Sequence, residues 1–274
     1  MWQRFVRNRA AVAGGLVVGL FVLLAIAGPA VAPYDPLAQN LANNYSGPTR
    51  AHPLGTDDLG RDTLSRLIHG ARISLGISVI GVGLGLVVGT TLGAVAAYYG
   101  SWTDAVVMRA MDVLLALPGI LLAIVIVTIL GSGVVNTVLA VAVFAIPTFA
   151  RIVRGSVLTI RTLDYIDACR AVGASDARIF ARHILPNALS PIIVHTTLML
   201  GTAILIASGL SFLGLGVQPP NPEWGAMLSK GRELIRTTPI VAVAPGVAIT
   251  LVVLSFSLLG DGLRDALDPK LQGR

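Results

Sequence analysis

The sequence predicts an all-α membrane protein with six transmembrane helices, and three observations support this fold class. Of the 274 residues, 54% are hydrophobic and only 12% are charged, with a mean hydropathy of +0.80. Soluble domains carry about a quarter charged residues. Uncharged stretches long enough to cross a bilayer recur along the chain. The basic residues gather between those stretches, which favours membrane orientation over a nucleic-acid partner.

The first apolar stretch covers residues 11–31 and follows a short basic segment, residues 1–10. A signal peptide has a similar order of segments. This uncharged stretch is too long for the core of a signal peptide, and no clear cleavage site follows it. We therefore expect a retained first transmembrane helix, preceded by a cytoplasmic segment and followed by an external segment, residues 32–72.

Five further helices are expected within residues 73–260. One uncharged stretch, residues 113–150, is too long for a single crossing, and Gly131-Ser132-Gly133 divides it. The expected spans are about 73–98, 105–130, 134–150, 191–217 and 240–259.

The Lys and Arg residues predict that both termini are cytoplasmic. The segments expected inside, among them a long loop at 151–190 and the C-terminal segment 261–274, carry 13 Lys and Arg residues. The segments expected outside carry 7. Cytoplasmic loops of membrane proteins carry the excess of Lys and Arg, so this orientation is favoured.

Glycine recurs every four residues in the second span, at Gly81, Gly85, Gly89 and Gly93. Small residues at this spacing share one helix face and let two helices approach closely. The neighbour is either another helix of this chain or a helix of a partner subunit, and the sequence leaves both open.

Several features needed for independent energy coupling are missing from the sequence. The apolar centres of the six spans contain no Asp, Glu, Lys or Arg, whereas a proton-coupled carrier needs an intramembrane relay. No Gly-x-x-x-x-Gly-Lys phosphate loop occurs, and Cys169 is the only cysteine. We therefore expect no catalytic residue, metal or cofactor, and any uphill transport must draw its energy from a partner.

The loop at 151–190 is the most polar stretch and predicts two short helices. Asp164 is expected to cap a helix over 165–172, which Gly173 ends in the left-handed conformation. Ser175 is expected to cap a second helix, 176–185, which Pro186 closes. The second helix has one apolar face, for which we predict docking on protein. That face consists of Ile179, Phe180, His183 and Ile184.

This loop resembles the "EAA" loop of ABC-importer permeases. The strings are Tyr165-Ile-Asp-Ala-Cys-Arg-Ala-Val-Gly-Ala-Ser175 and His183-Ile-Leu-Pro-Asn187. Asp167 replaces the usual Glu, and Cys169, which we expect to be a packing residue, replaces the second Ala. The resemblance implies a coupling helix on an ATPase subunit. The coupling residues would be Asp164, Asp167, Ala168, Arg170, Gly173, Ala174, Ser175, His183 and Pro186.

Other strings are similar to the C-type permeases for dipeptides, oligopeptides and nickel. They are His52-Pro-Leu-Gly-Thr-Asp-Asp-Leu-Gly-Arg-Asp62 with Gly70-Ala-Arg-Ile-Ser-Leu75, Leu117-Pro118, Leu210-Ser-Phe-Leu-Gly-Leu-Gly216 and Pro219-Pro-Asn-Pro-Glu-Trp-Gly225. The resemblance extends to Leu267-Asp-Pro269, essentially the whole chain.

The family resemblance implies a type I ABC importer permease fold in a bacterial inner membrane. This chain would form half of a pathway for di- or oligopeptides, with glutathione or nickel as alternative cargo. Its partners would be a homologous B-type permease, two ABC ATPases that hydrolyse the ATP, an external solute-binding protein and membrane lipid. Met199, Ser208 and Ser211 are possible pathway-lining residues.

Two external features allow more than one interpretation. Thr56 could cap a short surface helix that has Asp57 and Asp58 in its first turn and an Asp62–Arg66 ion pair. This helix could be purely structural, or it could contact a binding protein or the substrate. A second amphipathic helix with a Trp anchor is expected further on, and it could also act as a gate. Its apolar residues are Trp224, Met227, Leu228, Leu234 and Ile235.

Two rival functions are a secondary carrier driven by an ion gradient and a structural or assembly protein without a pathway. Uptake that survives ATP depletion but collapses with an ionophore would favour the carrier. Purification without an ATPase or second permease, together with unimpaired uptake after deletion, would favour the assembly protein.

Overall fold

The computed structural model describes residue 6 and residues 8–267, and helices make up most of these residues. Within the described part of the chain there is no β-strand, and the only β-type pairing is an isolated bridge between Thr56 and Asp62. Of the predicted terminal segments, residues 1–5, 7 and 268–274 lie outside the described residues. The end of the resemblance, at residues 268 and 269, lies outside them too.

Five helices of the described chain are long and apolar enough to cross a membrane. A sixth span is possible if the bent pair α4 and α5 counts as one crossing. The five are α2 (Arg9–Val31), α3 (Thr63–Tyr99), α6 (Val134–Ile160), α9 (Leu185–Phe212) and α11 (Ile240–Leu267).

The third predicted span, 105–130, is not one continuous helix. It consists of α4 (Ser101–Leu115) and α5 (Gly119–Leu130), which meet at an angle of 91°. Pro118 has no N–H to donate, and a proline disfavours the helical conformation of the residue before it. The chain therefore bends at Leu117-Pro118, so the continuous-helix prediction was wrong.

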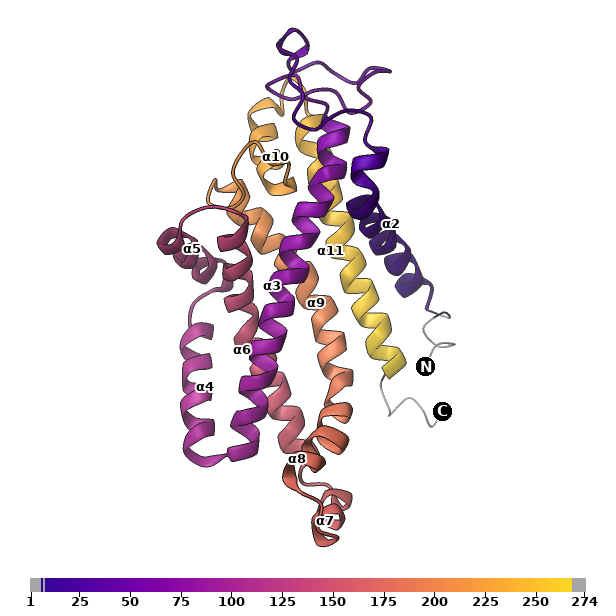
Figure 1. Cartoon of the computed structure of the whole chain (residues 1–274). Coiled ribbons are helices and arrows are strands. Elements are labelled where there is room, and N and C mark those ends of the chain that lie inside the picture. The colour runs from indigo at the N-terminus through magenta and orange to yellow at the C-terminus, as the bar shows by residue number, and fades with distance from the viewer. Residues whose placement is uncertain (1–5, 7, 268–274) are drawn as a thin grey trace.

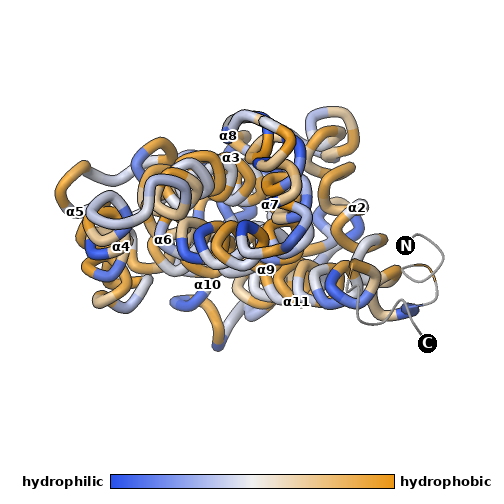
Figure 2. Tube along the Cα trace, turned by 90° about the horizontal axis from the view of Figure 1, so that it is seen from below, coloured by the Kyte–Doolittle hydropathy of each residue, from blue (hydrophilic) through white to orange (hydrophobic). Residues whose placement is uncertain are grey.

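The long helices lie side by side in an elongated bundle (Figure 1). Seen along the bundle, α4 and α5 lie at one side, α3, α6 and α9 in the middle, and α2 and α11 at the other (Figure 2). Two short helices, α7 (Asp164–Ala171) and α8 (Asp176–Ile179), project from one end, which we call the elbow end. Residues 32–62 and α10 (Trp224–Gly231) lie at the opposite end, which we call the cap end (Figure 1).

The start of α2 and the end of α11 lie next to each other. The side chains of Asn8 and Asp265 approach to 3.5 Å, and Gly14 packs against Ser255 and Leu258. Both helices have these ends on the side of the bundle nearer the elbow (Figure 1). This placement fits an even number of crossings.

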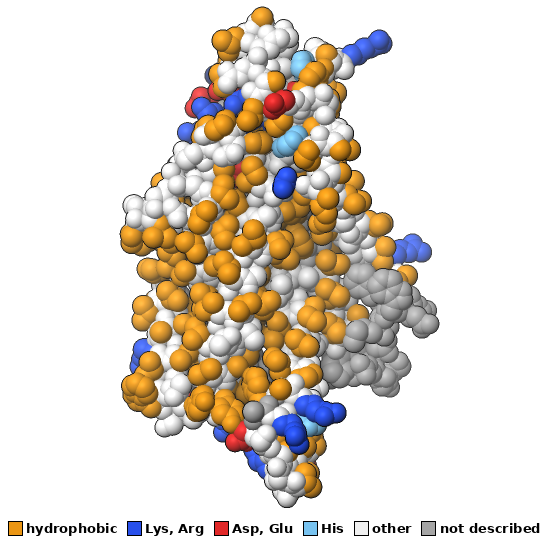
Figure 3. All heavy atoms as spheres, viewed as in Figure 1, with side chains coloured by type: hydrophobic (Ala, Val, Ile, Leu, Met, Phe, Trp, Pro, Cys, Tyr) orange, Lys and Arg blue, Asp and Glu red, His pale blue; other side chains and the backbone are white. Residues whose placement is uncertain are grey.

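Hydrophobic side chains cover the middle of the visible face, and charged side chains gather mainly at its two ends (Figure 3). Apolar side chains on the outside of the bundle include Leu16, Ile26 and Ile129, each more than 70% exposed. A water-soluble surface rarely carries so many large exposed apolar side chains. The middle band is therefore the part of the molecule that suits contact with lipid.

The four glycines of α3 pack against α6 of the same chain. A Cβ atom on Gly85 would lie 2.5 Å from Cβ of Ala145, and one on Gly89 would lie 2.5 Å from the carbonyl oxygen of Ile146. Both distances are far below van der Waals contact. The glycine face thus serves packing within the chain, which decides between the two alternatives left open above.

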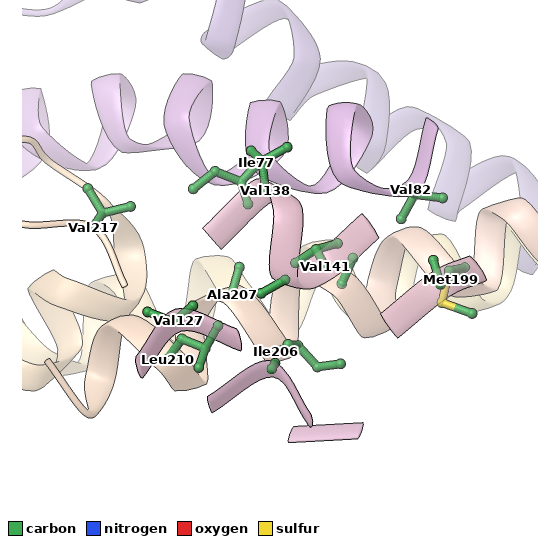
Figure 4. Close-up of a cluster of buried hydrophobic side chains, with 14 of the residues drawn as sticks. Ile77, Val82, Val127, Val138, Val141, Met199, Ile206, Ala207, Leu210 and Val217 are labelled. Atoms are coloured by element: carbon green, nitrogen blue, oxygen red, sulfur yellow. The ribbon is translucent and has the colours of Figure 1, made fainter. Parts of the chain in front are cut away.

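A buried apolar cluster, which overlaps this contact, joins α3, α5, α6 and α9 (Figure 4). Small side chains such as Ala140 and Ala207 let the helices approach, and larger ones fill the remaining space. The larger members shown are Ile77, Val82, Val127, Val138, Val141, Met199, Ile206, Leu210 and Val217.

The helix predicted to start at Thr56 does not form. Residues 57–61 make a turn, and α3 begins at Thr63 and continues into the membrane band without a break. Asp62 caps α3, because its Oδ2 accepts hydrogen bonds from the backbone N–H and the hydroxyl of Ser65, both at 2.7 Å. With its carboxylate engaged in capping, Asp62 does not form the expected ion pair with Arg66.

The second outer helix exists as α10, but Trp224 is not an interfacial anchor. Trp224 is fully buried, its indole N–H donates to the carbonyl oxygen of Leu67 at 3.0 Å, and Phe21 packs edge-on against its ring. Met227 is buried as well. The helix therefore packs into the bundle, on α9 and α11, and does not lie flat on a membrane surface.

We predict that Gly89→Ala destabilises the chain, because the added methyl group would press on the backbone of α6. Overpacking of this kind costs about 1–3 kcal/mol. The measurement is the apparent melting temperature of the purified protein in detergent. Gly83→Ala is the matched control, because no heavy atom of the described residues outside its own helix lies within 4 Å of its added methyl group. Equal melting temperatures for the two variants would contradict the close approach.

Candidate functional site

The predicted polar loop forms a compact elbow, residues 161–184, between α6 and α9. Its first arm is α7 (Asp164–Ala171), and its second begins with α8 (Asp176–Ile179). A wider helical turn, Phe180–Ile184, then joins α8 to α9 without interruption. The second arm is therefore the leading end of a long helix, and a displacement of the elbow acts directly on α9.

Gly173 turns the chain between the two arms. Its φ of +81° lies in the left-handed region, which side chains with a Cβ disfavour, so the prediction of a left-handed Gly173 is confirmed. The Gly173 N–H donates to the carbonyl oxygen of Arg170 at 2.9 Å, and the Ala174 N–H donates to that of Cys169 at 3.0 Å. These bonds satisfy carbonyl groups at the end of α7.

Two details of the predicted helix ends were wrong. Asp164 is the first residue of α7, preceded by Leu163, and this helix start has no side-chain capping bond. Its carboxylate still lies where the helix dipole favours a negative charge. Pro186 does not close the second helix, because it lies in the first turn of α9, where a missing N–H costs little.

Half of the apolar face of the second arm is buried inside the chain. Ile179 and Ile184 are at most 5% exposed and join a cluster with Ile166 of α7. Val153 and Val157 of α6 complete the cluster, together with Ala97, Ala188 and Ile192. Ile179 and Ile184 thus pack on α6 and the end of α3, whereas Phe180 and His183 are half-buried, so docking of this face on protein stays a prediction.

A different surface of the elbow remains open. Val172 is 84% exposed, and Leu163 and Tyr165 are each more than 40% exposed. Asp167 and Arg170 form a 2.7 Å ion pair beside them, and both side chains are solvated. The surface thus combines apolar contact area with charges, as protein interfaces do. Of the predicted coupling residues, Ala174 and His183 are half-buried, and those exposed are Asp164, Asp167, Ala168, Arg170, Gly173, Ser175 and Pro186.

Contacts between the two arms give the elbow a defined shape. His183 lies 3.8 Å from the sulfur of Cys169 and packs edge-on against the ring of Tyr165. The amide of Asn187 donates to the hydroxyl oxygen of Tyr165 at 3.3 Å. Cys169 is half-buried in this contact, in keeping with a packing residue.

Polar bonds tie the neighbouring helix ends to one another. Arg161 donates to the carbonyl oxygen of Ala97 at the end of α3, at 2.8 Å. Arg151 of α6 pairs with Asp112 of α4 at 2.8 Å, and Arg154 pairs with Asp104. The elbow thus joins α6 and α9 and bonds directly to the end of α3, while α6 is tied to α4 by two ion pairs.

The cap end holds a charged cluster that the sequence did not predict. Asp57 accepts a 2.7 Å hydrogen bond from Nε of Arg61 and lies 3.3 Å from Nε of Arg66. All three residues are at most 7% exposed. Asp57 therefore pairs with two buried guanidinium groups. The sequence had suggested instead that Asp57 interacts favourably with a helix dipole.

Glu223 is a second buried acid at the cap end. Its carboxylate caps α10, accepting hydrogen bonds from the N–H groups of Gly225 at 3.0 Å and Ala226 at 2.8 Å. The hydroxyl of Ser74 on α3 donates to it at 3.2 Å. Burial raises the pKa of Glu223, although these hydrogen bonds oppose the shift. The residue thus links α10 to α3 inside the protein.

The three possible pathway residues are buried within the chain. Met199 is 5% exposed and belongs to the apolar cluster of Figure 4. Ser211 accepts a hydrogen bond from the N–H of Val217 at 3.1 Å, and Ser208 is 6% exposed. The structure thus shows packing and loop-bracing contacts for them, and their contact with a solute stays a prediction.

The helical bundle and its apolar middle band (Figure 3) define a multi-span membrane protein. Residues 66–273 match the family described as "binding-protein-dependent transport system inner membrane component". Residues 1–48 match the N-terminal transmembrane domain of oligopeptide transport permease C. The chain belongs to this family and is a permease of an ABC importer, a multi-pass inner-membrane protein that is not itself an enzyme.

Among characterised relatives, the glutathione transport system permease protein GsiD of Pectobacterium atrosepticum is 51% identical over 99% of this chain and 90% of its own length. The same protein of Escherichia coli O6:K15:H31 is also 51% identical, with the same coverage. These values confirm the expected peptide/nickel branch of ABC importers.

Solved structures of the MetNI methionine ABC transporter, in inward-facing conformations, share the fold. One has a TM-score of 0.61 at 21% identity and covers 74% of this chain and 96% of that chain. A second crystal form has a TM-score of 0.58 at 22% identity, with the same coverage. The type I importer permease fold expected from the sequence is therefore confirmed.

We predict that Asp57→Ala strongly destabilises the cap end, because it leaves Arg61 and Arg66 buried without their shared carboxylate. Removing one partner of a buried ion pair costs about 3–5 kcal/mol. Asp58→Ala is the control, because the Asp58 side chain is 28% exposed and its loss should cost about 1 kcal/mol or less. Apparent melting temperatures in detergent measure the difference, and a larger loss for Asp58→Ala would contradict this role of Asp57.

We predict that Glu223 makes stability fall as pH rises. A raised pKa means that the folded chain holds this proton more tightly than the unfolded chain. The destabilising contribution of Glu223 is absent below its ordinary pKa of 4.5, where the folded and the unfolded chain both hold the proton. This contribution grows as the pH rises from there through the raised pKa. Glu223→Gln should remove this part of the pH dependence of the melting temperature. Glu233→Gln, at an exposed acid, should leave it unchanged, and identical profiles for all three proteins would refute the prediction.

Proposed function

We propose that this permease forms half of a translocation pathway and receives the energy of ATP hydrolysis through its elbow. The main support for this proposal is the structure of the elbow, found in a chain that belongs to a family of ABC-importer permeases. Its inner face is locked onto α6 and α9, while Val172, Tyr165 and Leu163 face outward. A rigid unit of this kind can pass a rigid-body movement from a docked partner to the spanning helices.

The docked partners would be two ABC ATPase subunits, one on each permease. This assignment puts the elbow end in the cytoplasm, as the distribution of Lys and Arg favours. The start of α2 and the end of α11 lie on the same side of the bundle, so both termini would be cytoplasmic too. The cap end would then face outward and meet an external solute-binding protein.

A homologous B-type permease would complete the pathway. The exposed apolar faces of the bundle offer surface for a second subunit as well as for lipid. The pathway would run between the two permeases, and their rocking would expose it alternately to the two sides. No described residue suggests a route through this chain alone, because the middle of the bundle is filled by side chains.

For the cargo we propose a short peptide, with glutathione as the first compound to test. The support is the 51% identity with permeases named for glutathione transport. Glutathione is itself a tripeptide, so this cargo lies within the peptide class that the sequence resemblance implies. A nickel complex has no such support from these relatives.

An ion-driven carrier has less support than this function. The described spans contain no Asp or Glu at mid-membrane depth, where a proton or sodium relay would need one. Family membership also favours an ATP-driven system.

The test of the proposed function is Val172→Asp in the assembled importer. A buried, unpaired carboxylate is costly at an apolar interface, so we expect at least a tenfold loss of ATPase copurification and of ATP-driven uptake. The variant chain should insert and melt like the wild type, because Val172 is 84% exposed.

Leu37→Asp provides the matched control, because it places the same charge at an exposed apolar position of the cap end. It should leave ATPase copurification unchanged. Full copurification and uptake with Val172→Asp would overturn the elbow as the energy input, and uptake that persists without ATP would overturn an ATP-driven function.

A further inference from the structure

The cap end contains a pocket that none of the roles described above uses. Its volume is about 260 Å³, and it lies between the 57–61 turn, the start of α3, the segment after α9, and α10. Five charged side chains line it, from segments far apart in the sequence. They are Asp57, Asp58, Arg61, Arg66 and Lys230.

The charges in this pocket do not balance. Asp57 binds Arg61 and Arg66 at 2.7 and 3.3 Å, and Asp58 lies 3.2 Å from Arg61. Lys230 reaches only to 4.0 Å from Asp58, and its side chain is 60% exposed. Three cations thus face two carboxylates. Lys230 is the least engaged cation and the one most accessible to a ligand.

An unpaired polar atom lies in the same wall. Thr63 is 1% exposed and lines the pocket, and its hydroxyl has no hydrogen-bond partner among the residues that the structure describes. Buried hydroxyl groups normally have a partner, because leaving one unpaired costs about 1–3 kcal/mol. This hydroxyl is therefore a second polar group of the pocket wall that no described residue engages.

We propose that this pocket binds the C-terminal carboxylate of a short peptide on its way into the importer. Lys230 supplies the balancing charge, and the Thr63 hydroxyl donates a hydrogen bond to the carboxylate. Pockets for whole drug-sized ligands measure about 300–1,000 Å³, so a slightly smaller pocket suits one end of a peptide. The proposal rests on the proposed peptide cargo and adds a residue-level site to it.

The experiment measures binding to the complete importer in nanodiscs, without its solute-binding protein, by titration calorimetry. The probes are glutathione, glutathione with its glycine carboxylate blocked as the ethyl ester, and inorganic phosphate. We expect glutathione to bind at least tenfold more tightly than the ester, since a hydrogen-bonded charge pair is lost. Equal binding of acid and ester would overturn the proposal. Phosphate binding as tight as that of glutathione would also overturn it, because the pocket would then be a simple anion site.

The variants locate the binding. Lys230→Gln should weaken glutathione binding about tenfold and leave ester binding unchanged. Arg236→Gln removes an exposed cation of the same outer segment that does not line the pocket, and it should have no effect. Equal effects of these two variants would overturn the site in favour of general electrostatic attraction.

The variant Thr63→Val distinguishes a binding role of Thr63 from a structural one, because stability and glutathione affinity should respond differently. Because the hydroxyl has no partner within the described chain, its loss should leave the melting temperature unchanged or higher. Glutathione binding should nevertheless weaken about fivefold. Unchanged glutathione affinity would remove Thr63 from the site and contradict the proposal.

Two further outcomes separate this site from the proposed function. If Lys230→Gln weakens only the docking of the solute-binding protein, the cap is a protein interface and the peptide site is overturned. If the wild-type importer takes up glutathione but binds none without its binding protein, the pocket is again overturned, while the function stands. The Val172→Asp experiment tests that function independently.

Discussion

The close packing of α3 on α6 is the contact on which the rest of the structure depends. Glycine at every fourth position of α3 lets the two backbones approach, and in an apolar solvent such close van der Waals contact replaces the hydrophobic effect that drives folding in water. α9 packs on both helices and completes the core of Figure 4. The same three helices carry the elbow at one end and the cap at the other, so both sites are built on one rigid unit.

The two ends of the bundle satisfy their polar groups in different ways. The elbow keeps its charges solvated, with the Asp167–Arg170 pair on the outside, and such a pair adds little stability. The cap buries Asp57 with two arginines and Glu223 with backbone N–H groups, so the loss of one partner there is costly. An exposed, adaptable surface suits the docking of a moving partner. A buried polar network suits a fixed surface, such as the proposed peptide pocket requires.

The elbow combines two requirements that a coupling element must meet. Its inner face must be locked to the spanning helices, and Ile166, Ile179 and Ile184 provide this. Its outer face must remain open, and Val172 is the most exposed large apolar residue of the described chain. The unbroken passage from α8 into α9 means that pressure on the elbow is transmitted along a helix, a much stiffer path than a loop.

The sequence by itself determined the membrane class, the approximate spans, the Gly173 turn and the family, because each depends on local composition or on a short motif. Only the tertiary structure decided which faces are covered. Ile179 and Ile184 of the predicted apolar face pack inward, since α6 supplies a nearer apolar partner. Asp57 pairs with Arg61 and Arg66, and Glu223 bonds to Ser74, 149 positions away in the sequence. Such pairings depend on the three-dimensional meeting of distant segments, which no local pattern encodes.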